Sequence, residues 1–136
     1  MIIADTSGLL SFFIESGSQH DRVAAWIEAK DPDMVVSPFV IGEIDYLVTT
    51  RYGVQWELEV LRELAGGAYH LATMDADDLA AATEVVERYR DLGVGITDAS
   101  LVMLAHRYRT RTILTLDQTH FRVLRPLDGG HFEVVP

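Results

Sequence analysis

Four acidic residues lie at points of the chain where an α/β fold would place an active site: Asp5, Glu43, Asp98 and Asp117. Asp5 and Asp117 each end an apolar, strand-like run, Asp98 opens an expected helix, and Glu43 lies within another. Four carboxylates gathered in one pocket repel each other strongly, so they need protons or divalent cations to coexist. The pattern therefore predicts a metal-dependent site.

Glu43 is the most informative of the four because it falls among the hydrophobic residues of a predicted helix. At about 100° of rotation per residue, four apolar side chains flank it within one arc: Phe39, Val40, Ile44 and Leu47. A carboxylate in a core-facing stripe is unfavourable unless it is paired, protonated or bound to a cation. The alternative interpretation is a buried ion pair with an arginine elsewhere in the chain.

Each of the other three acids also has a structural explanation when taken alone. Asp98 follows Thr97, a natural N-cap, and a helix dipole favours an acid in the first turn by roughly 0.3–1 kcal/mol. Apolar residues three, four and seven positions later nevertheless turn Asp98 towards the packed side of its helix. Asp5 and Asp117 could each cap a following turn. The four acids together are a stronger indication of a site than any one of them.

Composition restricts the chemistry that is available. The chain of 136 residues has no cysteine, which excludes a disulfide framework and a thiolate metal site. It contains no glycine-rich phosphate loop, no serine in a nucleophile elbow and no pair of histidines at zinc-ligand spacing. No apolar stretch approaches the roughly 20 residues of a membrane span. We therefore expect a cytoplasmic protein, without a membrane segment, whose chemistry depends on carboxylates and metal.

The charge distribution allows two interpretations. A net charge of −10 argues against a protein that coats nucleic acid. Of the eleven basic residues ten are arginines, and five of these lie between Arg107 and Arg125. Arg107, Arg109 and Arg111 could finish a helix and complement its negative C-terminal end. Alternatively, they could form a local phosphate-binding rim beside the acidic pocket.

Alternation of strand-like and helical runs predicts one α/β domain over residues 1–136, with a mostly parallel central sheet covered on both faces. The expected strands are 1–5, 34–37, 69–71, 112–116 and 132–135, the last at a sheet edge; the expected helices are 20–30, 39–52, 55–65, 75–89 and 97–108. Ligands of such sheets bind beyond the carboxyl ends of the strands. Asp5 and Asp117 should meet at that edge.

The chain resembles a PIN domain, and specifically the VapC-type toxins of bacterial toxin–antitoxin pairs. Four motifs in order carry the resemblance: Ile3-Ala4-Asp5-Thr6-Ser7, Pro38-Phe39-Val40-Ile41-Gly42-Glu43, Gly95-Ile96-Thr97-Asp98-Ala99-Ser100 and Thr115-Leu116-Asp117-Gln118-Thr119-His120-Phe121. The resemblance implies a PIN-like α/β/α sandwich and cleavage of structured translation RNA, transfer or ribosomal, with Mg²⁺ or Mn²⁺. It also implies a homodimer and a VapB-type antitoxin partner.

The acidic positions of that family map onto Asp5, Glu43, Asp98 and Asp117, which are then both the catalytic residues and the metal ligands. Our hypothesis is that Asp5 and Asp98 ligate one divalent ion, that Asp117 helps directly or through water, and that Glu43 holds a water or a second ion. Nearby hydroxyls would orient the carboxylates: Thr6, Ser7, Thr97 or Thr115. His120 is expected to have a structural role.

Two other function classes compete with this interpretation. An aspartate-nucleophile phosphatase would place a second acid two residues after Asp5, where this chain has Ser7, and a positioned lysine, whereas the only lysine is Lys30. A non-catalytic PIN-like binding module would have no need of all four acids. Metal binding separates the nuclease from the binding module, and a trapped acyl-phosphate on Asp5 would identify the phosphatase.

Overall fold

The computed structural model describes residues 1–136 and contains one sheet of five strands in the order β3-β2-β1-β4-β5. The strands are β1 (Ile2–Ala4), β2 (Met34–Val36), β3 (His70–Leu71), β4 (Thr112–Leu114) and β5 (Glu133–Val135). Every neighbouring pair is parallel. The predicted mostly parallel sheet is confirmed, and the terminal strand lies at its edge as expected.

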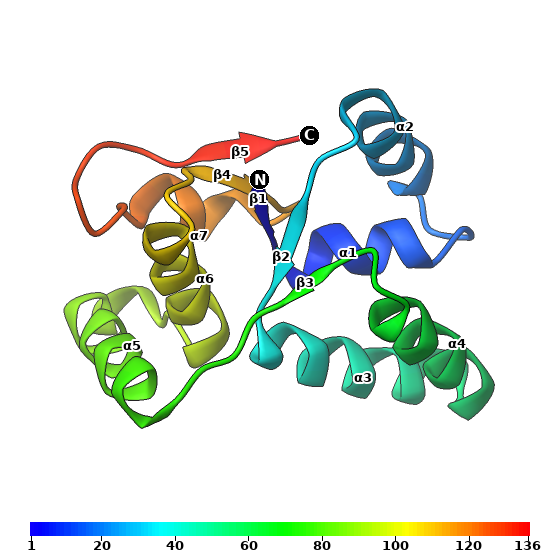
Figure 1. Ribbon diagram of the computed structural model, residues 1–136, viewed down its shortest axis with the longest axis horizontal. Coiled ribbons are helices and arrows are strands. Elements are labelled where there is room, and N and C mark those ends of the chain that lie inside the picture. The colour runs from blue at the N-terminus through cyan, green and yellow to red at the C-terminus, as the bar shows by residue number, and fades with distance from the viewer.

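Helices cover both faces of this sheet, as the sequence predicts. They are α1 (Thr6–Phe13), α2 (His20–Lys30), α3 (Pro38–Tyr52), α4 (Val54–Ala65), α5 (Ala76–Arg88), α6 (Ile96–Arg107) and α7 (Gln118–Val123), with a 3-10 turn at Arg90–Leu92. Figure 1 shows α1 to α4 on one side of the central strands and α5 to α7 on the other. The arrangement is an α/β/α sandwich. None of the helices is both long and apolar enough to cross a membrane.

The apolar runs of the sequence become the centre of the sheet because parallel strands are covered on both faces. All three residues of β1 and all three of β2 are buried. They belong to one cluster of 29 buried hydrophobic residues, to which the inner faces of the helices also contribute. The carboxyl ends of β1 and β4 are thereby held side by side, with Asp5 donating its backbone N–H to Leu114 O at 2.9 Å.

Local sequence signals account for most helix starts. The Ser37 hydroxyl caps α3 by accepting from the Phe39 N–H at 3.2 Å, and Pro38 occupies the first turn. Asp75 and Asp78 form a capping box at the start of α5, each carboxylate accepting from the backbone N–H of the other at 2.9 Å. Those acids therefore decorate a helix N-terminus, as the sequence indicates.

Two local predictions were wrong. The N-cap of α6 is Gly95 rather than Thr97, which lies inside the first turn and uses its hydroxyl elsewhere. The short helix α7 was not predicted, because six residues are too few for an apolar periodicity to emerge. Both differences matter for the site, since Thr97 and α7 each contact one of its acids.

Candidate active site

The four predicted acids line one cavity of about 590 Å³ at the carboxyl edge of the sheet. Asp5 follows β1 and Asp117 lies just beyond β4, whereas Asp98 is in the first turn of α6 and Glu43 is in the second turn of α3. The structure therefore brings all four together from segments far apart in the chain. The position is the one at which an open parallel sheet binds its ligands.

Asp5 is the buried acid of the cavity, with 6% of its surface exposed. Its carboxylate accepts hydrogen bonds from the Thr115 hydroxyl at 2.7 Å and from the Thr6 backbone N–H at 2.7 Å. The pKa of Asp5 is raised to about 6, mainly by burial and to a lesser extent by the negative charges of Asp98 and Glu43, while the two hydrogen bonds oppose the rise. The carboxylate has no ion-pair partner in the protein.

Thr115 ties the ends of β1 and β4 together beneath the cavity. Besides donating to Asp5, its buried hydroxyl accepts from the Asp117 N–H at 3.0 Å and lies 3.1 Å from the Ser7 hydroxyl. The Ser7 oxygen in turn accepts from the Leu116 N–H at 2.9 Å. The two hydroxyls therefore hold Asp5 and the backbone of Asp117 in a fixed relation, which is the supporting role that the sequence suggested for them.

Asp98 contacts His120, for which the sequence favoured a structural role over contact with a substrate. Nδ1 of His120 lies 2.6 Å from Asp98 Oδ2, and both side chains are mostly buried. Burial raises the pKa of Asp98, and the hydrogen bond from His120 opposes that rise. His120 also lines the cavity. The available signal was its position three residues after Asp117, which places it in the first turn of α7, where it lines the cavity.

The prediction that Glu43 faces the core was wrong. Glu43 is exposed, and the buried stripe of α3 runs through Val40, Ile44 and Val48. The apolar arc is wider than this stripe because α3 also packs against α1 and α4. No arginine pairs with Glu43, so the alternative of a buried ion pair was wrong as well. Instead its Oε2 accepts from the Thr97 hydroxyl at 3.0 Å, which connects α3 to α6.

Asp117 is exposed like Glu43, with 49% of its side chain accessible. It caps α7 by accepting from the Thr119 N–H at 3.3 Å, and Asp5 similarly caps α1. Both aspartates therefore cap helices, in agreement with the prediction that each could cap a following turn, and both also line the cavity. One fold feature, a strand followed at once by a capped helix, serves both purposes.

The donor set suits a hard divalent cation. Carboxylate oxygens are the ligands that Mg²⁺ and Mn²⁺ prefer, and a buried carboxylate without a cationic partner, such as Asp5, is stabilised when a cation approaches. As the side chains stand, no three His, Asp or Glu residues are gathered closely enough to hold one ion. The cavity is thus lined by carboxylate donors that do not form a coordination sphere.

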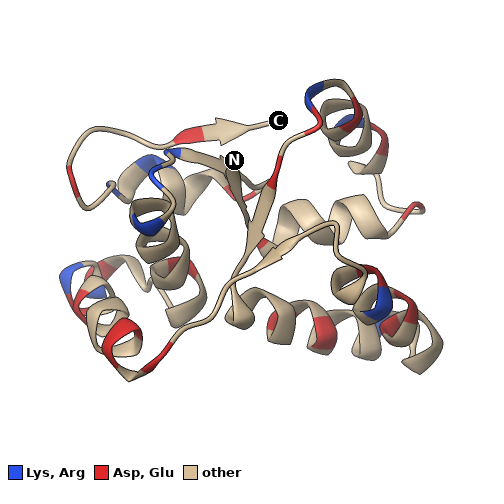
Figure 2. Ribbon diagram, in the orientation of Figure 1, with Lys and Arg blue, Asp and Glu red and all other residues tan.

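The arginine-rich segment does not form a rim beside these acids. Arg107 ends α6, whereas Asp98 lies in its first turn, nine residues or about 13 Å along the axis. Arg107 pairs with Asp78 at 2.8 Å and donates to the Thr73 carbonyl at 2.7 Å. Figure 2 shows the basic residues at the end of α6 that meets β4. The helix-end interpretation is confirmed for Arg107.

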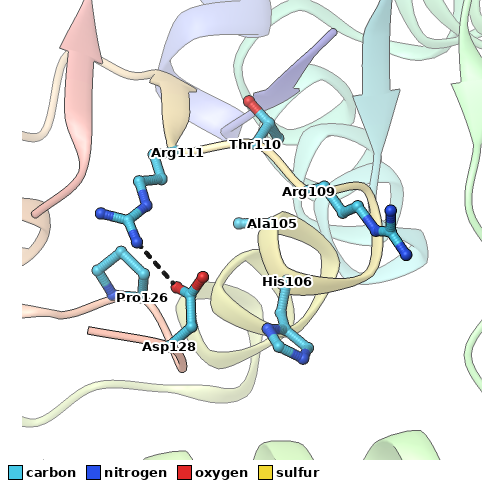
Figure 3. Close-up of a pocket in the computed structure, with 7 residues that line it drawn as sticks. All are labelled: Ala105, His106, Arg109, Thr110, Arg111, Pro126 and Asp128. Atoms are coloured by element: carbon cyan, nitrogen blue, oxygen red, sulfur yellow. Dashed lines mark hydrogen bonds and ion pairs between the residues drawn. The ribbon is translucent and has the colours of Figure 1, made fainter. Parts of the chain in front are cut away.

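Two further arginines of the segment line a different cavity of about 720 Å³, drawn in Figure 3. Arg111 pairs there with Asp128 at 3.2 Å, while Arg109 points to the other side of the opening. Because this cavity lies at the amino end of β4, it is on the sheet edge opposite the four acids. The interpretation as a phosphate-binding rim is therefore wrong for Arg107, Arg109 and Arg111.

Burial of Asp5 predicts that the metal-free protein loses stability as the pH rises. The pKa of Asp5 is about 6 in the folded state, against an ordinary 3.8, so the folded state binds the proton more tightly. The contribution of this tighter proton binding to the free energy of unfolding is complete below about pH 4. It is lost as the pH rises through 6, and the loss is roughly 2–3 kcal/mol. Urea unfolding in EDTA at pH 4.5 and 7.5 measures it. We expect the free energies of unfolding of wild type and Asp5→Asn to differ less at pH 4.5 than at pH 7.5. The same difference at both pH values would show that the pKa of Asp5 is not raised in the folded state.

Comparison with known proteins adds a family and its relatives. The sequence model described as "PIN domain" matches residues 2–125. Ribonuclease VapC26 of Mycobacterium tuberculosis is 52% identical over 135 residues, which span 99% of this chain and 100% of that protein. The sequence similarity therefore extends over the strands, the helices and all four acids of the cavity.

Solved structures share the fold at low sequence identity. VapC20 of Mycobacterium tuberculosis, described as a toxin that cleaves the sarcin–ricin loop, superimposes with a TM-score of 0.85 at 19% identity, with 100% of both chains covered. The VapBC2 complex of Rickettsia felis, bound to a DNA fragment from its promoter, gives a TM-score of 0.70 at 16% identity over 100% of both chains. At these identities the likeness concerns the fold alone.

Proposed function

Because this chain belongs to the PIN domain family, we propose that it is a metal-dependent endoribonuclease and the toxin of a VapBC-type toxin–antitoxin pair. The observation that carries the proposal is the cavity in which Asp5, Glu43, Asp98 and Asp117 meet. A relative that is 52% identical over its full length and named a ribonuclease supports the same reaction. Phosphodiester hydrolysis by carboxylates alone would lack any group to neutralise the attacked phosphate, so a cation completes the chemistry.

The proposed roles follow from where each acid lies. Asp5 and Asp98, the two less exposed acids, would hold one Mg²⁺ or Mn²⁺, with Asp117 completing the set directly or through water. Glu43, which is exposed and tethered by Thr97, would orient the attacking water or a second ion. A cation held there lowers the pKa of water and stabilises charge that builds on the phosphate. His120 would keep Asp98 oriented towards the cavity.

Thr97→Val is expected to lower the cleavage rate by about 10- to 100-fold, because Thr97 supplies the hydroxyl that positions Glu43 and supporting groups of this kind typically have effects of that size. Valine keeps the shape of threonine without the donor. Single-turnover cleavage measures the change, with Thr83→Val as the control because its hydroxyl bonds only within α5. Equal rates for the two variants would show that Glu43 needs no support from Thr97.

The proposed partners rest on the relatives. We propose a VapB-type antitoxin as protein partner, since solved structures of the same fold are toxin–antitoxin complexes. We also propose a homodimer, which the resemblance to VapC-type toxins implies. The RNA we propose is a structured RNA of translation, transfer or ribosomal, as the sarcin–ricin loop that VapC20 cleaves illustrates. We also propose that residues 1–136 act as one PIN-like domain, since one cluster of 29 buried residues packs the sheet.

Cleavage of total cellular RNA by the purified chain, free of any antitoxin, tests the proposal. Discrete fragments are expected with Mg²⁺ or Mn²⁺ and none with excess EDTA. Asp98→Ala should remove the same fragments, which would exclude a contaminating nuclease. Intact RNA in every condition, including transfer and ribosomal RNA supplied separately, would contradict the proposed function.

A further inference from the structure

We propose that Arg51 binds an RNA phosphate close to the scissile one and that Tyr52 stacks against a neighbouring base, so that the RNA strand leaves the acidic cavity across the C-terminal end of α3. The inference rests on the proposed function and names the residues that would hold its substrate. It concerns Arg51, which lines the cavity, and Tyr52, which lines a neighbouring hollow, and it does not involve the four acids.

The acidic cavity continues into a second, shallower hollow. That hollow has a volume of about 180 Å³ and shares Leu10 and Arg51 with the cavity of the four acids. Its other lining is mostly polar and comes from the end of α1, the loop before α2 and the end of α3: Ser11, Ser18, Gln19 and Tyr52, among others. These two adjacent hollows, which meet at Leu10 and Arg51, make up the groove along which we propose that the RNA runs.

Arg51 stands at the junction of this groove because of its spacing on α3. Glu43, Leu47 and Arg51 follow one another at four-residue intervals, so all three fall along one side of the helix and line the acidic cavity. Arg51 lies about 12 Å from Glu43 along the helix axis. It is near enough to contact the same RNA strand and too far to touch the reacting phosphate held by the acids.

Charge singles out Arg51 among the basic residues. It is the only lysine or arginine that lines the cavity of the four acids, and it makes no hydrogen bond or ion pair within the protein. By contrast, Arg90, Arg107 and Arg111 are paired with carboxylates. The chain has a net charge of −10, and the four acids of the cavity repel an approaching phosphate backbone. An unpaired guanidinium beside them offers local attraction with a geometry suited to phosphate.

Tyr52 offers an aromatic surface beside that charge. It is 41% exposed, and its ring lies 6.3 Å from the ring of Trp56, which is also 41% exposed. Unpaired bases of RNA are recognised by stacking on aromatic side chains next to arginines that hold the backbone. An arginine and a tyrosine adjacent in sequence, both lining one groove, supply both parts of this recognition.

Binding of a fluorescein-labelled single-stranded oligoribonucleotide, followed by anisotropy at several NaCl concentrations, tests the inference. The Asp5→Asn background prevents cleavage during the titration. Arg51→Gln is expected to weaken binding about 10-fold and to reduce the slope of log affinity against log salt by about 0.7, since one phosphate contact is lost. Arg51→Lys should keep the slope. Tyr52→Ala should weaken binding about 5-fold or more without changing the slope, and Tyr52→Phe should bind as before.

The matched control is Arg62→Gln, because Arg62 is exposed on the neighbouring helix α4, is unpaired and lines neither hollow. Equal affinity and equal slope for Arg51→Gln and Arg62→Gln would overturn the inference, as would the absence of any RNA binding. If Arg51→Gln and Arg62→Gln behave alike but wild type still cleaves RNA, only the inference about Arg51 fails and the proposed function stands. If Arg51 contributes to binding but wild type never cleaves, the proposed function fails alone.

Discussion

Asp5→Asn is expected to lower the rate of RNA cleavage by about 1000-fold or more, because Asp5 is the acid that a cation at the centre of the cavity would neutralise most directly. Loss of one ligand of a catalytic cation removes several kcal/mol of transition-state stabilisation. Asparagine keeps the size of the side chain and one acceptor oxygen for the Thr115 hydroxyl, which lies 2.7 Å from the carboxylate. The change therefore tests charge rather than packing.

The same substitution should make the metal-free protein more stable at pH 7.5. Burial raises the pKa of Asp5 to about 6, so at pH 7.5 the folded protein holds a buried charge that asparagine lacks. Addition of Mn²⁺ should raise the Tm of wild type and leave that of Asp5→Asn nearly unchanged. Asp77→Asn, at an exposed position of α5, serves as the control for both measurements. Wild-type cleavage by Asp5→Asn would contradict the role assigned to this residue.

Gly8→Ala is expected to destabilise the protein by about 2–3 kcal/mol, because the first turns of α1 pack directly on β4 and overpacking of this kind has costs of that order. A Cβ at position 8 would lie 2.7 Å from Leu114 O and 2.8 Å from Leu114 Cγ. The nearest atom belongs to the backbone of a central strand, so it cannot move aside cheaply. The same carbonyl accepts from the Asp5 N–H, and a shift of α1 would displace the acid as well.

Gly42→Ala is the matched control for Gly8→Ala. Position 42 is also helical, but a Cβ there would meet nothing within 4 Å. Alanine is favoured over glycine in a helix interior by about 0.5–1 kcal/mol, so this variant should be slightly more stable than wild type. Urea unfolding compares the two. Equal stability of Gly8→Ala and wild type would show that α1 can withdraw from β4 without loss.

The convergence of the acids could be predicted because it depends on topology. Strand-like runs alternate with helical ones, which predicts parallel strands whose carboxyl ends share one edge, and Asp5 and Asp117 end two of those runs. Glu43 and Asp98 were added because each is followed by apolar residues at helical spacing, and the motifs that resemble PIN domains contain all four acids. The structure confirms the α/β/α sandwich and brings all four side chains to one cavity, while their catalytic and metal-binding roles stay predictions.

The features that the sequence did not predict depend on side-chain contacts between elements. Glu43 looked buried because α3 is apolar on several sides, but part of that surface packs against α1 and α4 rather than the sheet. Thr97 looked like the N-cap of α6, yet the N-cap is Gly95, two residues earlier, which leaves the Thr97 hydroxyl free to bond Glu43. The contact of His120 with Asp98 required knowledge of α7, whose six residues carry no periodic signal.

The predicted phosphate-binding rim of arginines was wrong for a related reason. Arg107, Arg109 and Arg111 lie close to Asp117 in sequence, which made a shared site plausible. In the structure they precede β4 whereas Asp117 follows it, and a parallel strand separates the two ends of the sheet. The basic residue that does line the acidic cavity is Arg51, far away in sequence and brought there by α3. Sequence distance was therefore a poor guide to the electrostatics of the site.

Titration of the metal-free protein with Mn²⁺ by calorimetry at pH 7.5 tests the central claim most directly, because every proposed step depends on a cation among the four acids. We expect saturable Mn²⁺ binding to wild type and much weaker binding to Asp5→Asn and Asp98→Asn. Asp77→Asn should bind Mn²⁺ with the same affinity as wild type. No saturable heat with wild type, or the same affinity in all four proteins, would contradict the claim and favour a PIN-like module that only binds a partner.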